Sequence, residues 1–245
     1  MRKNKDFDEI YGFHAVNAAL RNKSRKFRNL IISSKNKNRI NKNLLIKIDT
    51  LTEIPIKEIN RIYGNEDKHQ GIILKATKIN QPSIEDIVKN CNSEKEIIVM
   101  LDHVNDPNNI GSIMRSCSLF NCKNLIVSKD SAPEITSTMI KAASGALEVV
   151  NYIKVTNLSR TISLLKKNNF WAIGLDSNEV IHNNFDMPKR CLLIMGSENK
   201  GLRELTKKNC DEIQNIPISK NNKYCLESLN VSNACSIALY KHFVN

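Results

Sequence analysis

The stretch IIVMLDHVNDPNNIGSIMRSC, residues 97–117, joins an apolar run to a helical pattern through a polar turn. The run IIVML has the composition of a buried strand. Asp106, Pro107 and Gly111 are typical of a tight turn, and Asn109 is well placed to cap the following helix. Turn chemistry does not account for Arg115, which the pattern places on the second turn of that helix. An arginine there is usually a surface residue, unless other polar groups meet it.

Apolar runs of strand length recur after residue 96 and are separated by several helical segments. They span 97–101, 124–128, 149–155, 170–175, 191–196 and 213–218, and a last helix is expected at 230–243. Such alternation is typical of an α/β fold with a parallel sheet covered on both faces. Ligands of these sheets bind beyond the carboxyl ends of the strands. We therefore expect any functional site at that edge.

The first 78 residues predict a separate, small α/β domain. Its expected helices lie at 11–22, at 38–48 and up to 59–63, and its expected strands at 29–33 and 71–77. Residues 79–95 are polar and predict a linker that carries a short helix. The expected domains are therefore a small domain at 1–78 and a domain with the parallel sheet at 96–245.

The charge of the chain is concentrated near its start. The whole chain of 245 residues carries a net charge of +12, and 41% of it is hydrophobic, which suffices for a packed core. Residues 1–75 hold 17 Lys and Arg against 8 Asp and Glu, whereas residues 76–245 hold 20 against 17. This excess favours contact between the N-terminal part and a polyanion such as nucleic acid, over a merely solvated basic surface.

Cysteine and histidine usage argues against disulfide and metal chemistry. The seven cysteines are odd in number, form no C-x-x-C pair and lie in apolar segments, which favours reduced and mostly buried thiols. The five histidines are dispersed, so no metal site is expected. The charged start of the chain and the lack of long apolar runs predict a cytoplasmic protein without a membrane partner.

Two further polar groups follow apolar runs. Gly196, Glu198 and Gly201 come directly after 191–196, in a turn that could present backbone N–H groups to a ligand or be only a tight turn. Ser228 and Asn230 precede the last helix, where either residue could be its cap. The chain contains no G-x-G-x-x-G dinucleotide fingerprint, which argues against a nucleotide-dependent oxidoreductase.

Together the three groups form a recognisable series: Asn-x-Gly-x-x-x-Arg (109–115), Gly-x-Glu-x-x-Gly (196–201) and Ser-Leu-Asn-Val-Ser (228–232). In this order they resemble the motifs of the SpoU (TrmH) family, which are RNA ribose 2′-O-methyltransferases of the SPOUT class. The resemblance covers residues 96–245. In addition, IYGFHAVNAAL (10–20) and HQGIILKA (69–76) resemble the substrate-binding domain of the branch that methylates a guanosine in large-subunit (23S) ribosomal RNA.

The resemblance implies a trefoil knot in the C-terminal domain, a homodimer, and S-adenosyl-L-methionine as the methyl donor. It implies that the cofactor pocket is lined by the backbone or side chains of Met195, Gly196, Ile216, Ile218 and Leu229. It makes Arg115 the main catalytic residue. The remaining active-site positions that it implies are Asn109, Glu198, Ser228 and Asn230.

Two other functions remain open at this level. One is ribose 2′-O-methylation of a tRNA, since that activity occurs in the same family. The other is a non-catalytic RNA-binding or ribosome-assembly protein on the same scaffold. All three motifs keep their polar residues, which mere binding would not demand and which favours the enzyme.

Overall fold

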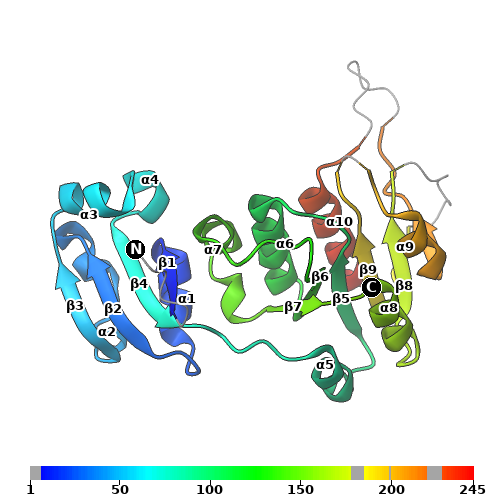
Figure 1. Cartoon of the computed structure of the whole chain (residues 1–245), viewed down its shortest axis with the longest axis horizontal. Helices are drawn as coiled ribbons and strands as arrows, with labels where there is room; N and C mark the ends of the chain where they lie inside the picture. The colour runs from blue at the N-terminus through cyan, green and yellow to red at the C-terminus, as the bar shows by residue number, and fades with distance from the viewer. Residues whose placement is uncertain (1–6, 178–184, 199, 220–227) are drawn as a thin grey trace. The chain divides into compact units, whose positions relative to one another are not determined.

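The computed structural model describes residues 7–177, 185–198, 200–219 and 228–245, without the side chains of residues 67 and 68. The chain divides into two compact units (Figure 1). The first contains Met1–Asn80 together with Ile135–Val149, and the second contains Gln81–Glu134 and Val150–Asn245. The expected functional boundaries, 1–78, 79–95 and 96–245, stay predictions.

The first unit is built on a four-stranded sheet of strand order β1-β4-β2-β3, in which only β2 and β3 are parallel. Its elements up to residue 77 are β1 (Phe7–Tyr11), α1 (Phe13–Arg21), β2 (Phe27–Ile32), a 3-10 helix (Ser34–Arg39), α2 (Lys42–Leu45), β3 (Ile48–Glu53), α3 (Ile56–Tyr63), α4 (Glu66–His69) and β4 (Ile72–Thr77). A small N-terminal α/β unit was expected and is confirmed.

Two details of the first unit differ from expectation. The helix expected at 38–48 is wrong: only four residues of that range are α-helical, and Ile48 already begins β3. The strands β1 and β3 were not foreseen. β3 lies at the edge of the sheet and its side chains are mostly exposed, so it lacks the apolar run by which a buried strand is recognised.

The segment 135–149 belongs to the first unit because its α7 (Ser137–Ala143) and the 3-10 helix Ala146–Glu148 pack there. A buried arginine fixes this packing. The Nε of Arg25 donates to one oxygen of Glu148 at 2.9 Å, and its Nη2 lies 2.9 Å from the other oxygen. Its Nη1 donates to Asp8 at 2.8 Å and to the carbonyl of Thr77. These partners come from the start, the middle and the end of the unit in sequence, so Arg25 joins its parts.

The second unit is built on a six-stranded sheet of order β10-β8-β9-β5-β6-β7, in which every pairing is parallel. The predicted parallel sheet is thus confirmed. Its elements are α5 (Ile84–Asn90), β5 (Glu96–Leu101), α6 (Pro107–Leu119), β6 (Asn124–Ser128), β7 (Asn151–Val155), α8 (Leu158–Lys166), β8 (Trp171–Leu175), β9 (Arg190–Met195), α9 (Glu204–Asn209), β10 (Glu212–Gln214) and α10 (Val231–Val244).

Helices cover both faces of this sheet. Ile98 and Met100 of β5 pack in one core with α5 and α8. Because side chains alternate along a strand, Ile97, Val99 and Leu101 face the other side, where α6 and α10 pack against each other. The expected strand at 213–218 is too long: β10 ends at Gln214, and residues 215–219 belong to no helix or strand. That freed segment becomes part of the site.

The described cysteines have free thiols, four of them buried (Cys117, Cys122, Cys191 and Cys235), while Cys225 lies outside the described residues. Burial raises the pKa of the Cys91 thiol to about 11 and that of Cys210 to about 12. No helix of the described chain is long and apolar enough to cross a membrane. The trefoil knot stays a prediction, since residues 220–227 lie outside the described part.

Candidate active site

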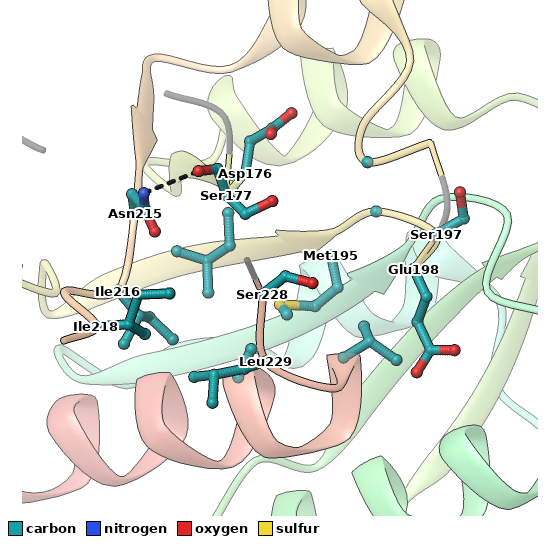
Figure 2. A pocket seen from close by; sticks show the side chains of 15 residues that line it. Asp176, Ser177, Met195, Ser197, Glu198, Asn215, Ile216, Ile218, Ser228 and Leu229 are labelled. Atoms are coloured by element: carbon teal, nitrogen blue, oxygen red, sulfur yellow. Dashed lines mark hydrogen bonds between the residues drawn. The ribbon is translucent and has the colours of Figure 1, made fainter. Parts of the chain in front are cut away.

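A cavity of about 290 Å³ lies at the carboxyl edge of the six-stranded sheet. Since β8, β9 and β10 are parallel, their carboxyl ends meet there, and the start of α10 closes the remaining side (Figure 2). This is the edge at which ligands of parallel α/β sheets bind. The lining residues are Leu175, Asp176, Ser177, Met195, Gly196, Ser197, Glu198, Gly201, Asn215, Ile216, Ile218, Ser228, Leu229, Val231 and Ala234.

The turn after β9 is made possible by two glycines. A Cβ at Gly196 would lie 2.2 Å from the backbone carbon of Gly201, so no side chain fits there. Gly201 has a φ of +63°, in the left-handed region that glycine adopts without strain. Two backbone bonds between Ser197 and Gly201, of 2.8 and 3.1 Å, close the turn. The glycine spacing in the sequence therefore reflects a close approach that brings the backbone to the cavity wall.

The floor of the cavity is apolar. Met195, Ile216, Ile218 and Leu229 gather in its middle in Figure 2, and Ile218 and Leu229 are each more than a third exposed. Exposed aliphatic side chains around a concave site suit a flat, apolar ring system such as adenine. All five positions expected to contact the cofactor, including Gly196, line this cavity. Their role in binding stays a prediction.

Three of the expected active-site residues form one hydrogen-bonded group at the side of this cavity. The amides of Asn109 and Asn230 both donate to Glu198 Oε1, at 3.0 and 2.5 Å. Asn230 Nδ2 also donates to Asn109 Oδ1 at 3.1 Å. These residues follow β5, β9 and the segment after β10, so the fold alone brings them together. All three residues are at least partly exposed. Both amides bond Oε1 of Glu198, so Oε2 is left for a ligand.

The sequence predicted the N-terminal cap of one of the two helices beside this group and not that of the other. Asn230, one of the two expected candidates, caps α10 and accepts from the N–H of Ser232 at 2.9 Å. The expectation that Asn109 caps α6 is wrong: Asp106 is the cap and Pro107 is the first helical residue. Asn109 therefore lies inside the first turn, where its amide side chain is released to reach Glu198.

Arg115 does not join the hydrogen-bonded group. It is the ninth residue of α6 and so lies in the third turn rather than the second. Six residues of helix place it about 120° around the axis from Asn109. Its side chain is exposed and lines neither the cavity nor its rim. Ser228, by contrast, does line the cavity, beside Leu229.

A buried carboxylate holds the edge together below the site. Asp102 follows β5, is fully buried, and accepts from the N–H of Arg203 at 3.3 Å and from the hydroxyl of Thr206 at 2.6 Å. The Nε of Arg203 lies 2.8 Å from its other oxygen. Asp102 therefore ties the end of β5 to α9, which follows the Gly196–Gly201 turn.

Sequence reasoning missed several residues of the cavity. Asp176 and Ser177 follow β8, and Ser177 accepts a bond from Asn215 at 3.1 Å through its carbonyl (dashed in Figure 2). Asp176 pairs with Lys207 of α9 at 2.7 Å. Their signal was the same as for the other groups, namely polar residues directly after an apolar strand. Among the described residues, no group of three or more His, Cys, Asp or Glu is arranged to hold a metal ion.

The fold and site define a class: a two-unit α/β protein with a ligand cavity and an amide–carboxylate group at the carboxyl edge of a parallel sheet. The comparison with protein families identifies it further. Residues 96–240 match the SpoU rRNA methylase family, and residues 10–82 match the RNA 2′-O ribose methyltransferase substrate-binding family. The chain therefore belongs to the SpoU rRNA methylase family.

Relatives match over nearly the whole chain. The 23S rRNA (guanosine-2′-O-)-methyltransferase RlmB of Salmonella typhimurium is 35% identical over 95% of this chain and 96% of its own length. The protein of the same name from Escherichia coli K12 is 36% identical over the same shares. Among solved structures, the SpoU methyltransferase AviRb from Streptomyces viridochromogenes, in complex with AdoMet, superposes with a TM-score of 0.78 at 20% identity, covering 99% of this chain and 91% of that one.

Proposed function

We propose that the protein is an S-adenosyl-L-methionine-dependent RNA ribose 2′-O-methyltransferase that acts on a guanosine of 23S ribosomal RNA. The observation that carries the proposal is the bonded group Asn109–Glu198–Asn230 beside a cavity of about 290 Å³ whose floor is formed by aliphatic side chains. The two relatives described above, which bear this activity in their names, support the choice of RNA because they match both units of the chain.

The residues that line the cavity suit the cofactor. Met195, Ile216, Ile218 and Leu229 offer aliphatic surface for the adenine ring, and Gly196 leaves its backbone open where a Cβ would collide with the Gly201 turn. Bound there, S-adenosylmethionine supplies a methyl group that its sulfonium charge has already activated. The protein has to align the acceptor hydroxyl and help it to lose its proton.

The chain's own residues can perform both tasks. Both amides bond Oε1 of Glu198, which fixes the carboxylate and leaves Oε2 to accept a hydrogen bond from the ribose hydroxyl. Asn109 and Asn230 hold that geometry, and Ser228 lines the cofactor cavity. Arg115 grips the neighbouring phosphate and polarises the hydroxyl. It does not act as a base, because a guanidinium keeps its proton in proteins.

A homodimer is part of the proposal. Exposed apolar side chains gather at the end of α6 and along α10: Leu119, Ile237, Tyr240, Phe243 and Val244. Phe120 contacts the rings of Tyr240 and Phe243 at 5.9 and 6.0 Å, so the two helices form one continuous surface. Apolar patches of this kind are typical of subunit interfaces. Arg115 lies on the same helix and away from its own cavity, which favours its service to the site of the partner subunit.

Mixed dimers test this shared site. Arg115→Ala and Asn230→Ala should each abolish methyl transfer as homodimers. If Arg115 serves the partner, a mixed dimer has one site that contains both wild-type residues, and mixing the two variants should restore up to a quarter of the wild-type rate, because about half of the dimers are mixed. No recovery in a demonstrated mixed dimer would place Arg115 and Asn230 in the same chain's site.

The basic first unit completes the proposal as the part that grips RNA phosphates. The proposal also includes the trefoil knot implied by the family resemblance, and action in the cytoplasm, where ribosomal RNA would be met.

Transfer of tritiated methyl from S-adenosylmethionine to unmethylated ribosomal RNA and to tRNA tests the proposal, with Arg115→Ala as the control. Label in 23S RNA that the control loses is the expected result. Label in tRNA alone would keep the chemistry but overturn the choice of substrate. Bound cofactor without label in either RNA or in assembling ribosomal particles would favour a non-catalytic RNA-binding protein.

A further inference from the structure

A second hollow, of about 360 Å³, opens beside the cofactor cavity. The chain after β5 and the turn after β9 form its walls, with His103, Asp106, Asn109, Ser197, Glu198 and Lys200 among the lining residues. Ser197 and Glu198 also line the cofactor cavity. The turn after β9 is therefore a wall that the two spaces share.

This arrangement has a geometric consequence for methyl transfer. An acceptor oxygen must approach the methyl carbon from the side opposite to the departing sulfur, so donor and acceptor need adjoining spaces. Glu198 borders both spaces, and Asn109, which bonds it at 3.0 Å, borders only the second. A hydroxyl held by Glu198 from the second hollow would face the first.

The second hollow also has the size and the chemistry for one nucleotide. Its volume falls within the range of small-ligand sites. His103 is exposed at its rim and offers an aromatic ring on which a base can stack. Lys200 offers an ammonium group for a phosphate. The carboxylate of Asp106 accepts from the N–H groups of Asn108 and Asn109 as a helix cap, where the positive end of the helix dipole partly offsets its charge.

The backbone conformation of His103 also supports a role of this residue in the second hollow. Its φ is +60°, a left-handed conformation that glycine adopts freely and that costs other residues energy. Other non-glycine residues of the chain share this conformation, for example Asn169 with a φ of +64°, in the turn before β8 and outside both spaces. What distinguishes His103 is that the strained turn delivers a ring to a hollow beside the reactive group.

We propose that the second hollow binds the target nucleotide, with its base stacked on the ring of His103, a phosphate at Lys200 and the ribose hydroxyl at Glu198. This inference rests on the proposed function for the reaction, but not for the binding. His103 is thus a positioning residue for the substrate, and it has no part in holding the cofactor.

The binding itself is tested with guanosine 5′-monophosphate and the whole protein, after S-adenosylhomocysteine has filled the cofactor cavity. The ring signals of the five histidines are followed by NMR, and the His103→Phe spectrum identifies the signal of His103. The expected result is that the purine shifts the His103 signal, whereas ribose 5-phosphate, which has no base, does not. A His103 signal that the nucleotide leaves in place would overturn the proposal.

Kinetics with unmethylated 23S RNA supply the second readout. His103→Gly should raise KM for RNA about tenfold, in the range expected for the loss of one stacked base, and leave S-adenosylhomocysteine affinity within twofold. His103→Phe, which keeps a ring, should stay within about threefold of the wild-type KM. The matched control Asn169→Gly makes the same backbone exchange away from the hollow and should leave KM unchanged. A wild-type KM for His103→Gly would overturn the proposal.

The two readouts separate this inference from the proposed function. Methyl transfer without any nucleotide effect at His103 would refute the second hollow and leave the enzyme intact. A shifted His103 signal in a protein that methylates no RNA would keep the nucleotide site and refute the methyltransferase.

Discussion

Two polar groups, one in each unit, join parts of the chain that are distant in sequence, and they differ in what they leave unsatisfied. Arg25 in the first unit is fully buried and faces Asp8, Glu148 and the carbonyl of Thr77. Glu198 in the second unit is exposed and accepts from two amides through one oxygen only. The first group pairs charge with opposite charge, whereas no cation among the described residues pairs with the carboxylate of the second.

The difference explains what each group is for. A buried arginine that faces two carboxylates and a carbonyl is out of reach of a ligand in solvent, so its role is to stabilise the packing of its unit. An exposed carboxylate fixed by two neutral amides contributes little to stability, yet it keeps a free oxygen in a defined place. Structural and functional polar groups can thus be told apart by whether a ligand in solvent can reach their unused hydrogen-bonding capacity.

Removing the buried cation should have the largest effect. Arg25→Ala leaves the carboxylates of Asp8 and Glu148 without their partner and should lower the stability of the first unit by about 3–5 kcal/mol. The matched control is Arg61→Ala, which breaks an exposed contact of 3.9 Å with Glu58 and should cost less than about 0.5 kcal/mol.

The readout of this experiment can be resolved by unit. Trp171, the only tryptophan, lies in β8 of the second unit, so its fluorescence reports that unit alone. Limited proteolysis within residues 7–80 reports the first unit. An equal loss of stability in both units would show that Arg25 stabilises more than its own unit. No loss of stability in either unit would refute its structural role.

Changing the exposed carboxylate should affect the rate and spare the fold. Glu198→Ala should lower kcat for methyl transfer on the order of 10²-fold and change the free energy of unfolding by less than about 1 kcal/mol. Glu198→Gln retains a carbonyl oxygen for the two amides but loses the charge. A rate for Gln close to that of Ala would assign the effect to the charge, whereas a rate close to wild type would assign it to the hydrogen bonds.

The smallest effect, a change of stability with pH, is expected from a polar group that is buried like Arg25 but has few partners like Glu198. His242 of α10 is buried, and its one hydrogen bond within the described part of the chain is to the carbonyl of Lys189, at 3.0 Å. Burial lowers the pKa of its imidazole below the ordinary 6.5, despite that bond, which acts in the opposite direction. As the pH falls below 6.5 the unfolded chain binds a proton that the folded chain refuses, so stability should decrease.

The comparison of wild type with His242→Gln isolates this contribution, because glutamine can still donate to the carbonyl of Lys189 but does not titrate. The urea midpoint is measured between pH 8 and pH 5. The wild type should lose stability relative to the variant only in the acidic part of that range. Parallel curves for both proteins would show that His242 does not couple folding to pH.

The fold of the second unit was predictable because its strands are buried on both faces. A continuous apolar run such as 97–101 is a local signal, and parallel order follows from the alternation with helices. β3 carried no such signal, since an exposed edge strand has few apolar side chains. The helix predicted at 38–48 was wrong for a related reason. The few apolar residues of this range fit a helical spacing, but over too short a stretch to distinguish a helix from a strand.

The site was predictable only as a set of positions. Polar residues directly after apolar strands marked Asn109, Glu198 and Asn230, and the same signal at Asp176 and Ser177 was present but unused. The sequence did not indicate which residue caps α6. Asp106 and Asn109 are both good caps, and only the start of the helix at Pro107 decides between them.

The sequence by itself determined the strands of the parallel sheet, the glycines of the turn after β9 and the residue types of the site, because each depends on neighbours along the chain. Only the tertiary structure decided that Asn109 meets Glu198 and Asn230, which lie 89 and 121 positions further on. It also decided that Glu198 borders two spaces while Arg115 borders neither. Such contacts depend on the order of strands in the sheet, which local periodicity does not encode.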